Sequence, residues 1–184
     1  MKNNIIILLA LLTVILVLPT CKKKPVQELA VTVQFSAGDA RIVSPQGEKA
    51  AVPGDVISFD DSIVTGASSV VDLNFGTRGV IRIVENSRVK MTALQGSSGN
   101  EQAQFEMKTG KVLVIMSKLS KETGFSIITP TTLAAIRGTS FMVVSDPKNS
   151  KIYVLKGRIL VQLAKEGKLA EHIEKMLEAN KKVV

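Results

Sequence analysis

The stretch "EQAQFEMKTGKVLVIMS", residues 101–117, contains the pattern that decides the fold. In its first half Ala103, Phe105 and Met107 alternate with polar residues, as in a β-strand with one buried and one solvated face. Its second half, "KVLVIMS", is apolar throughout, which predicts a strand covered on both faces. The "KTG" between them, residues 108–110, contains the glycine that tight turns favour. We therefore expect two strands separated by a turn.

Outward from this stretch the same period of two recurs. Val71, Leu73 and Phe75 share one side of "VVDLNF", and "GVIRIV", "GFSIIT" and "GRILVQL" are further short apolar runs that follow a glycine. Such runs are separated by glycine-bearing turns at a spacing of roughly ten to sixteen residues, which leaves no room for crossover helices. The pattern predicts one mainly β domain over residues 30–163, with its many short strands packed in a sandwich-like or solenoid-like arrangement.

The end of the chain changes character. In "GKLAEHIEKMLEANKKVV" the apolar residues Leu169, Ile173, Met176 and Leu177 follow helical spacing, and Glu–Lys pairs four residues apart would support a helix. We expect a C-terminal amphipathic helix over residues 164–184 that docks on the β domain or, alternatively, binds a partner.

The amino-terminal segment is typical of an export signal. Fourteen residues from Ile5 to Leu18 are apolar apart from Thr13, and Lys2 precedes them. A membrane-spanning helix needs roughly 20 apolar residues, so this run is short for a permanent span. The single cysteine of the chain, Cys21, follows it closely.

The stretch "VLPTC" resembles a bacterial lipobox, in which a lipoprotein signal peptidase cuts before a cysteine that carries a diacylglyceryl group. The resemblance implies a signal peptide over residues 1–20, lipidation of Cys21, and a polar tether over residues 21–29. Two or more acyl chains give stable anchoring in a membrane. Two alternatives remain: the three lysines at 22–24 favour an uncleaved helix with the domain in the cytoplasm, and Cys21 could be an ordinary thiol.

Charge and composition exclude several function classes. The net charge is +8, but residues 25–164 carry 15 basic and 12 acidic residues, a net charge of only +3. The excess lies beside the predicted anchor, where it suits anionic head groups, so we expect no nucleic-acid partner. The chain has no Trp and one Tyr, which argues against stacking platforms for sugars or single-stranded nucleic acid.

Groups for catalysis are sparse. The only histidine, His172, is expected on the surface of the C-terminal helix, and no second histidine is available for a metal site. Asp60 and Asp61 are adjacent, which suits a turn better than a catalytic pair. Nucleotide-binding and metalloprotease motifs are absent from the sequence. We therefore predict no catalytic residues, no metal, no cofactor and no small-molecule substrate.

Two longer parts of the chain resemble the FecR family. "VPGDVISFDDSIVTGASSVVDLNF", residues 52–75, with "VIRIVENSRVKM", residues 80–91, looks like the first half of a FecR domain. "FSIITPTTLAAIRGTSFMVV", residues 125–144, resembles the second landmark of the family, and "KIYVLKGRILVQL" resembles its closing hairpin. The residues that match the family motifs, for which we expect structural roles, are Gly54, Asp55, Thr65, Gly66, Ser69, Thr129, Pro130, Arg137, Gly138, Thr139 and Phe141.

The chemistry of these residues agrees with structural roles. Gly54 and Asp55 suit a turn in which a carboxylate accepts backbone N–H groups, and Pro130 limits ladder bonding. Arg137 stands between apolar residues, so we expect it to be partly buried with its donors spent on carbonyls or a carboxylate. A ligand or partner contact for Arg137, Gly138 and Thr139 is the alternative.

The resemblance also implies a function. Iron-responsive regulators of this family combine the domain with a cytoplasmic segment that binds a sigma factor, and here only four residues precede the apolar run. We therefore expect a stand-alone, non-catalytic lipoprotein of the bacterial cell envelope, facing the periplasm or the cell surface, whose FecR-like domain binds another envelope protein or senses a signal. The alternatives are a structural or peptidoglycan-binding module and a membrane-anchored regulator related to iron-responsive signalling.

Overall fold

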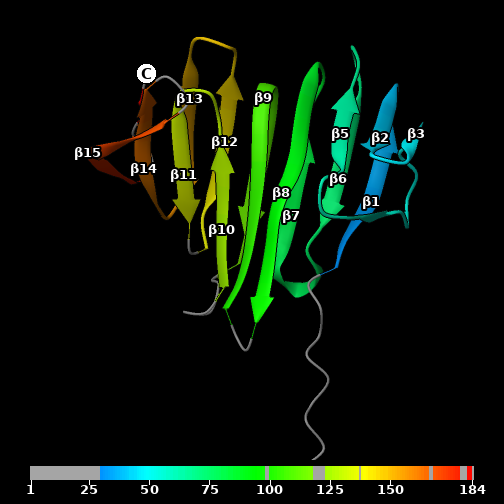
Figure 1. The fold of residues 1–184 in the computed structure, drawn as a ribbon, viewed down its shortest axis with the longest axis horizontal. Coiled ribbons are helices and arrows are strands. Elements are labelled where there is room, and N and C mark those ends of the chain that lie inside the picture. Colours follow the sequence, from blue (N-terminus) through cyan, green and yellow to red (C-terminus); the bar gives the residue numbers. More distant parts are fainter. Residues whose placement is uncertain are drawn as a thin grey trace, which may run out of the picture.

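The structure is a computed structural model that describes residues 30–97, 100–117, 123–136, 138–165, 168–178 and 182–183. Within these ranges the chain forms β-strands and a single short 3-10 turn, Gly76–Arg78. The prediction of a mainly β fold with many short strands is confirmed. The paired strands form one continuous curled sheet that folds into two layers, which we call sheet A and sheet B (Figure 1).

Both layers follow the same order along the molecule. Sheet A contains, in order, β4 (Val56–Ile57), β1 (Val31–Ala37), β6 (Val70–Asn74), β7 (Gly79–Ile83), the second part of β9 (Asn100–Met116), β12 (Ser140–Ser145), β13 (Ser150–Lys156) and β16 (Lys182–Val183). Sheet B contains β3 (Gly47–Ala50), β2 (Ala40–Ser44), β5 (Ser62–Thr65), β8 (Ser87–Ser97), the first part of β9, β10 (Thr123–Ile128), β11 (Thr132–Ile136), β14 (Arg158–Lys165) and β15 (Lys168–Glu178).

The chain reaches this arrangement by crossing repeatedly between the layers. β1 in sheet A continues through a short corner into β2 in sheet B, and β5 continues through another into β6 in sheet A. All the pairings between neighbours are antiparallel except that of β9 with β10, which is parallel. In Figure 1 the strands of sheet B, such as β8, β10 and β11, lie in front of β7, β12 and β13.

β9 joins the two layers at the middle of the molecule. Its residues 100–109 pair with β8 in sheet B, and its residues 110–116 pair with β7 and β12 in sheet A. The buried positions change from Phe105 and Met107 to Val112 and Val114, so the inward side switches from odd to even numbers. Gly110 lies at this switch with a φ of +116°. The expectation of two strands separated by a turn at "KTG" is therefore wrong, because one strand bends there.

The apolar half of β9 is covered on one face within the described residues. Val112 and Val114 are completely buried, whereas Ile115 on the outer face is 52% exposed and Leu113 is half-buried. The expectation that "KVLVIMS" is covered on both faces is wrong for this outer face.

The core lies between the layers and is organised around three aromatic rings. Phe75 follows β6 of sheet A, and its ring lies 5.7 Å from that of Phe105 in β9 and 5.8 Å from that of Phe125 in β10, both in edge-to-face geometry. Aromatic pairs prefer this arrangement. All three side chains are at most 3% exposed, so they connect the layers through the centre of the domain.

The predicted C-terminal helix is wrong for residues 168–178. These residues form β15, which pairs with β14 in an antiparallel ladder from Arg158↔Glu178 to Lys165↔Lys168. Without β15, β14 would be the edge strand of sheet B and would leave a row of N–H and C=O groups unpaired. His172 falls in this strand rather than in a helix.

The N-terminal signal helix, residues 1–20, and the tether, residues 21–29, lie outside the described residues. Within the described ranges no helix has both the length and the apolarity to cross a membrane.

Candidate functional site

Most of the described family-motif residues gather at connections between strands, three of which pass from one layer to the other. Gly54 and Asp55 form the connection from β3 to β4, and the Asp55 carboxylate accepts a hydrogen bond from Val52 N at 3.0 Å and from Lys49 Nζ at 2.6 Å. The hydrogen bond from Lys49, aided by the backbone N–H of Val52, lowers the pKa of Asp55 from its ordinary value of 3.8. The Asp55 side chain thus stabilises the turn in which it lies.

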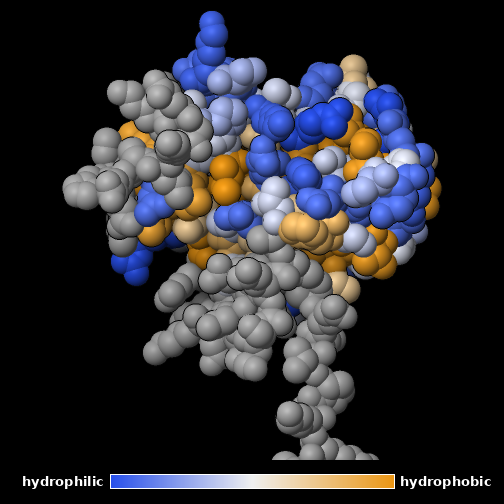
Figure 2. Space-filling model, viewed as in Figure 1, coloured by the Kyte–Doolittle hydropathy of each residue, from blue (hydrophilic) through white to orange (hydrophobic). Residues whose placement is uncertain are grey.

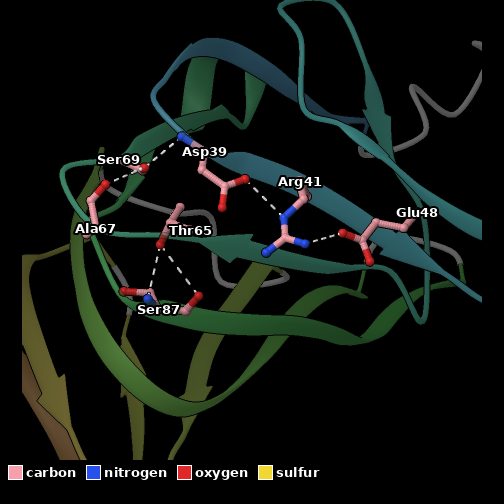
Figure 3. A network of polar contacts seen from close by, with 7 residues as sticks. All are labelled: Asp39, Arg41, Glu48, Thr65, Ala67, Ser69 and Ser87. Carbon is pink, nitrogen blue, oxygen red and sulfur yellow. Dashed lines mark hydrogen bonds and ion pairs between the residues drawn. The ribbon is translucent and has the colours of Figure 1, made fainter.

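A second corner joins β5 to β6 and is shown in Figure 3. The Thr65 hydroxyl donates to Val84 O at 2.6 Å and accepts from Ser87 N at 3.1 Å, and its side chain is buried. Ser69 Oγ accepts from Asp39 N at 2.8 Å and donates to Ala67 O at 3.0 Å. These hydroxyls fasten the corner to its neighbours in both layers.

Gly66 belongs to the same corner. Its N–H donates to Asp39 O at 2.8 Å, and an added Cβ would lie 2.9 Å from the Asp39 carboxylate. Beyond this corner Asp39 forms an ion pair with Arg41 at 3.1 Å, and Arg41 contacts Glu48 on β3 (Figure 3). Both ion pairs are largely exposed, so they add little stability.

The hairpin turn from β10 to β11, within sheet B, contains a cluster of hydroxyl groups. Thr129 Oγ1 accepts hydrogen bonds from Thr132 N at 2.9 Å and from Ser150 Oγ at 2.8 Å, and Pro130 follows it in the turn. Thr131 Oγ1 donates to Ser150 Oγ at 2.8 Å, and Ser150 also lies 3.0 Å from Ser145 Oγ. Each hydroxyl is engaged by another hydroxyl or by the backbone.

The last motif lies at the opposite end of the sheets. Thr139 Oγ1 donates to Arg158 O at 2.8 Å, which connects the end of β11 to the start of β14, and Phe141 is completely buried in β12. Gly138 has a φ of +96° in the same connection. Arg137 and Cys21, the other two predicted sites, lie outside the described residues.

Groups that could act as acids, bases or ligands are separated from one another. Asp60 forms an ion pair with Lys90 at 2.8 Å, whereas the buried Asp61 accepts a hydrogen bond from Ser58 N at 2.8 Å, so the two carboxylates have different partners. Among the described residues no three His, Cys, Asp or Glu side chains are close enough to share a metal ion. In the described part of the chain the Asp55 and Asp61 carboxylates hold turns and strand connections in place.

Sequence reasoning missed a groove on the outer face of sheet B. It has a volume of about 560 Å³ and runs over β9, β10, β11 and β14. Leu133, Ala135 and Leu160 give it an apolar floor, and Gln104 donates to Ser126 Oγ at 3.4 Å at one side. In Figure 2 hydrophobic residues are visible on this side of the molecule among hydrophilic ones. The signal in the sequence was limited to three apolar residues at outward positions, Leu133 and Ala135 on β11 and Leu160 on β14.

The fold and this arrangement of motifs define the class of the protein: a two-layer all-β domain whose motif residues build its corners. The family model described as "FecR protein" matches residues 61–160, which is more than half of the 184 residues. The chain belongs to the FecR protein family.

Solved structures support the same fold. Two crystal structures of a candidate anti-sigma factor from Parabacteroides distasonis superpose on the chain with a TM-score of 0.52 at 15% sequence identity. The match covers 66% of this chain and 52% of that one, so the chain spans about half the length of its structural neighbour. Comparison with curated proteins finds no match.

Proposed function

We propose that this protein is a non-catalytic, lipid-anchored protein of the bacterial cell envelope whose FecR domain serves as a protein-interaction or sensing module. The observation that carries the proposal is the FecR match over residues 61–160. The sequence "VLPTC" supplies the anchor, because acylation of Cys21 would tether the domain to a membrane through residues 21–29.

The contacts of the motif residues support a binding role over a catalytic one. Catalysis needs a nucleophile or acid within hydrogen-bond reach of a base. The hydroxyls of Thr65, Ser69, Thr129 and Thr139 instead bond to backbone groups or to other hydroxyls. They hold the corners in shape and leave binding to the outer faces of the sheets.

The groove on sheet B is the surface that best fits an envelope protein as partner. Binding sites combine an apolar lining with a few polar groups that fix orientation. Here Leu133, Ala135 and Leu160 provide the apolar lining, while Gln104 and Arg158 provide amide and guanidinium groups at its sides. An extended segment with apolar side chains and a carboxylate would match this surface.

Site-specific photo-crosslinking in intact cells tests this partner role. A photoreactive residue at Ser126, inside the groove, should give one discrete adduct that Leu133→Glu removes, because the carboxylate disrupts the apolar floor. The same residue at Lys49, on the exposed edge strand β3, is the matched control and should give none. Equal adducts from both positions, or none from Ser126, contradict the proposal.

A membrane-anchored regulator is a second candidate, favoured by the structural neighbour that is described as a candidate anti-sigma factor. In that case the domain would lie in the cytoplasm behind an uncleaved helix, with the lysines at 22–24 retained on the inner side. A reporter active only in the periplasm, fused after Val184, separates the two candidates. Activity supports the envelope protein, and inactivity in an expressed fusion supports the regulator.

A further inference from the structure

The outer face of sheet A carries an apolar surface on four neighbouring strands, β7, β9, β12 and β13, which we call the sheet A face. Met142 on β12 pairs with Leu113 on β9 and with Tyr153 on β13, so these three side chains lie in one row. Ile115 is 52% exposed and Leu155 is 55% exposed. The outward apolar residues of the sheet A face are Val80, Leu113, Ile115, Met142, Val144, Tyr153 and Leu155.

Every charged residue on these four strand segments is basic. They are Arg82, Lys111, Lys151 and Lys156. Arg82 is neutralised by Asp72 on the adjacent strand β6, through two contacts of 2.7 Å. Lys111 and Lys151 flank Val144 from both sides, since both pair with it in the ladder. The sheet A face therefore combines an apolar centre with a positively charged rim.

The start of the domain lies in the same layer. β1, which begins at Val31, is a strand of sheet A, and only residues 22–30 separate it from Cys21. The ten residue-to-residue steps from Cys21 to Val31 reach at most about 35 Å when the chain is fully extended. Five strand spacings, from β1 to β13, amount to about 24 Å. A membrane that holds Cys21 is thus within reach of the whole sheet A face.

We propose that the sheet A face docks on an anionic lipid surface; this inference rests on the lipid anchor of the proposed function. Apolar side chains enter the boundary between head groups and acyl chains, and basic residues at the rim are attracted to anionic head groups. Tyr153 suits this boundary because its ring is apolar and its hydroxyl is polar. With the sheet A face on the membrane, the groove on sheet B faces away from it and stays open to a partner.

Tyr153 also provides the test, because it is the only tyrosine in a chain without tryptophan. The mature full-length lipoprotein is reconstituted in vesicles of phosphatidylethanolamine and phosphatidylglycerol, with or without brominated acyl chains. We expect bromine to quench the fluorescence of Tyr153 in the anionic vesicles. Quenching should be lost in phosphatidylcholine vesicles at high salt. These head groups have no net charge, and the salt screens any remaining attraction between lipid and the lysines of the sheet A face.

Two variants localise the contact. Ile115→Asp should abolish the quenching because it places a charge in the apolar centre of the sheet A face. Val52→Asp is the matched control, because Val52 is also 52% exposed but lies in the connection from β3 to β4. This control should leave the quenching unchanged. Circular dichroism checks that both variants fold; if Ile115→Asp does not, Lys111→Glu with Lys151→Glu replaces it and should reduce the quenching.

Flotation with the vesicles separates this inference from the proposed function. Protein that floats but whose Tyr153 is not quenched retains its anchor and contradicts docking by the sheet A face. Protein that does not float overturns the anchor and the docking together. Concentration-dependent crosslinking of two copies through Leu155, without quenching, would assign the sheet A face to a dimer instead and overturn the lipid contact.

Discussion

At the scale of single residues, Gly110 determines how β9 serves both layers. Its φ of +116° lies in the region that L side chains rarely adopt, and a Cβ at this position would overlap the Cα and side chain of Ser87. Ser87 is itself buried and bonds to Lys111 N at 3.0 Å. The close approach of these two backbones turns the strand from sheet B into sheet A.

Gly110→Ala should therefore lower the free energy of unfolding by more than about 2 kcal/mol, from backbone strain and overlap combined. Gly47→Ala is the matched control, since Gly47 has a φ of +143° but nothing within 4 Å of an added Cβ. It should cost about 1 kcal/mol or less. Urea denaturation of both variants gives the comparison, and equal losses would contradict the role of the close approach.

The lowered pKa of Asp55 predicts how the stability of the connection from β3 to β4 depends on pH. A carboxyl whose pKa is lowered on folding stabilises the folded state above its unfolded pKa, and this stabilisation is lost as the pH falls through the folded pKa. The pKa of Asp55 is lowered from 3.8 chiefly by Lys49, whose side chain is 59% exposed. Asp55→Asn should then destabilise the protein by less than about 1 kcal/mol at neutral pH.

The measurement is the difference in unfolding free energy between the wild type and Asp55→Asn as a function of pH. It should shrink as the pH falls below 3.8, because the wild-type carboxyl becomes protonated and loses its advantage. A difference that stays constant down to the most acid pH would show that the carboxylate charge is not what holds this corner.

At the scale of elements, the three phenylalanine rings connect the two layers. Phe105→Ala should lower the free energy of unfolding by about 3–5 kcal/mol, because it opens a cavity between Phe75 and Phe125. Phe35→Ala, at a side chain that is 48% exposed, should cost less than about 0.5 kcal/mol. Thermal or urea unfolding followed by circular dichroism measures both, and similar losses would contradict a core centred on these rings.

The elements also show why some predictions succeeded. Alternation in "VVDLNF" and "EQAQFEMK" assigned Leu73 and Phe105 to the buried side because a strand in a two-layer protein has one inward face. "KTG" could not be interpreted correctly, since a glycine with positive φ serves a hairpin turn and a bend within a strand equally well.

The C-terminal segment failed for a different reason. Leu169, Ile173 and Leu177 are four residues apart, which is about one turn of a helix and also an even number of steps along a strand. Periodicity therefore could not choose between them. The pairing with β14 decided in favour of the strand, and a long-range pairing of this kind is not encoded in the local pattern.

At the scale of the whole molecule, the motif residues and the binding surfaces occupy different places. Motif residues such as Thr65 and Thr129 were found from the sequence through the resemblance to the FecR family, and the structure places both in hydrogen-bonded connections between strands. The groove on sheet B and the sheet A face depend on which strands become neighbours, so they emerged only from the fold. If the two proposals hold, the two outer faces would allow the domain to bind a membrane and a protein partner at the same time.

The measurement that tests this account most directly is the mass of the mature amino-terminal peptide, released from envelopes by a protease that cuts after glutamate. We predict a peptide of residues 21–28 that carries a diacylglyceryl thioether on Cys21. A peptide that still begins at Met1, or an unmodified Cys21 thiol, would contradict it.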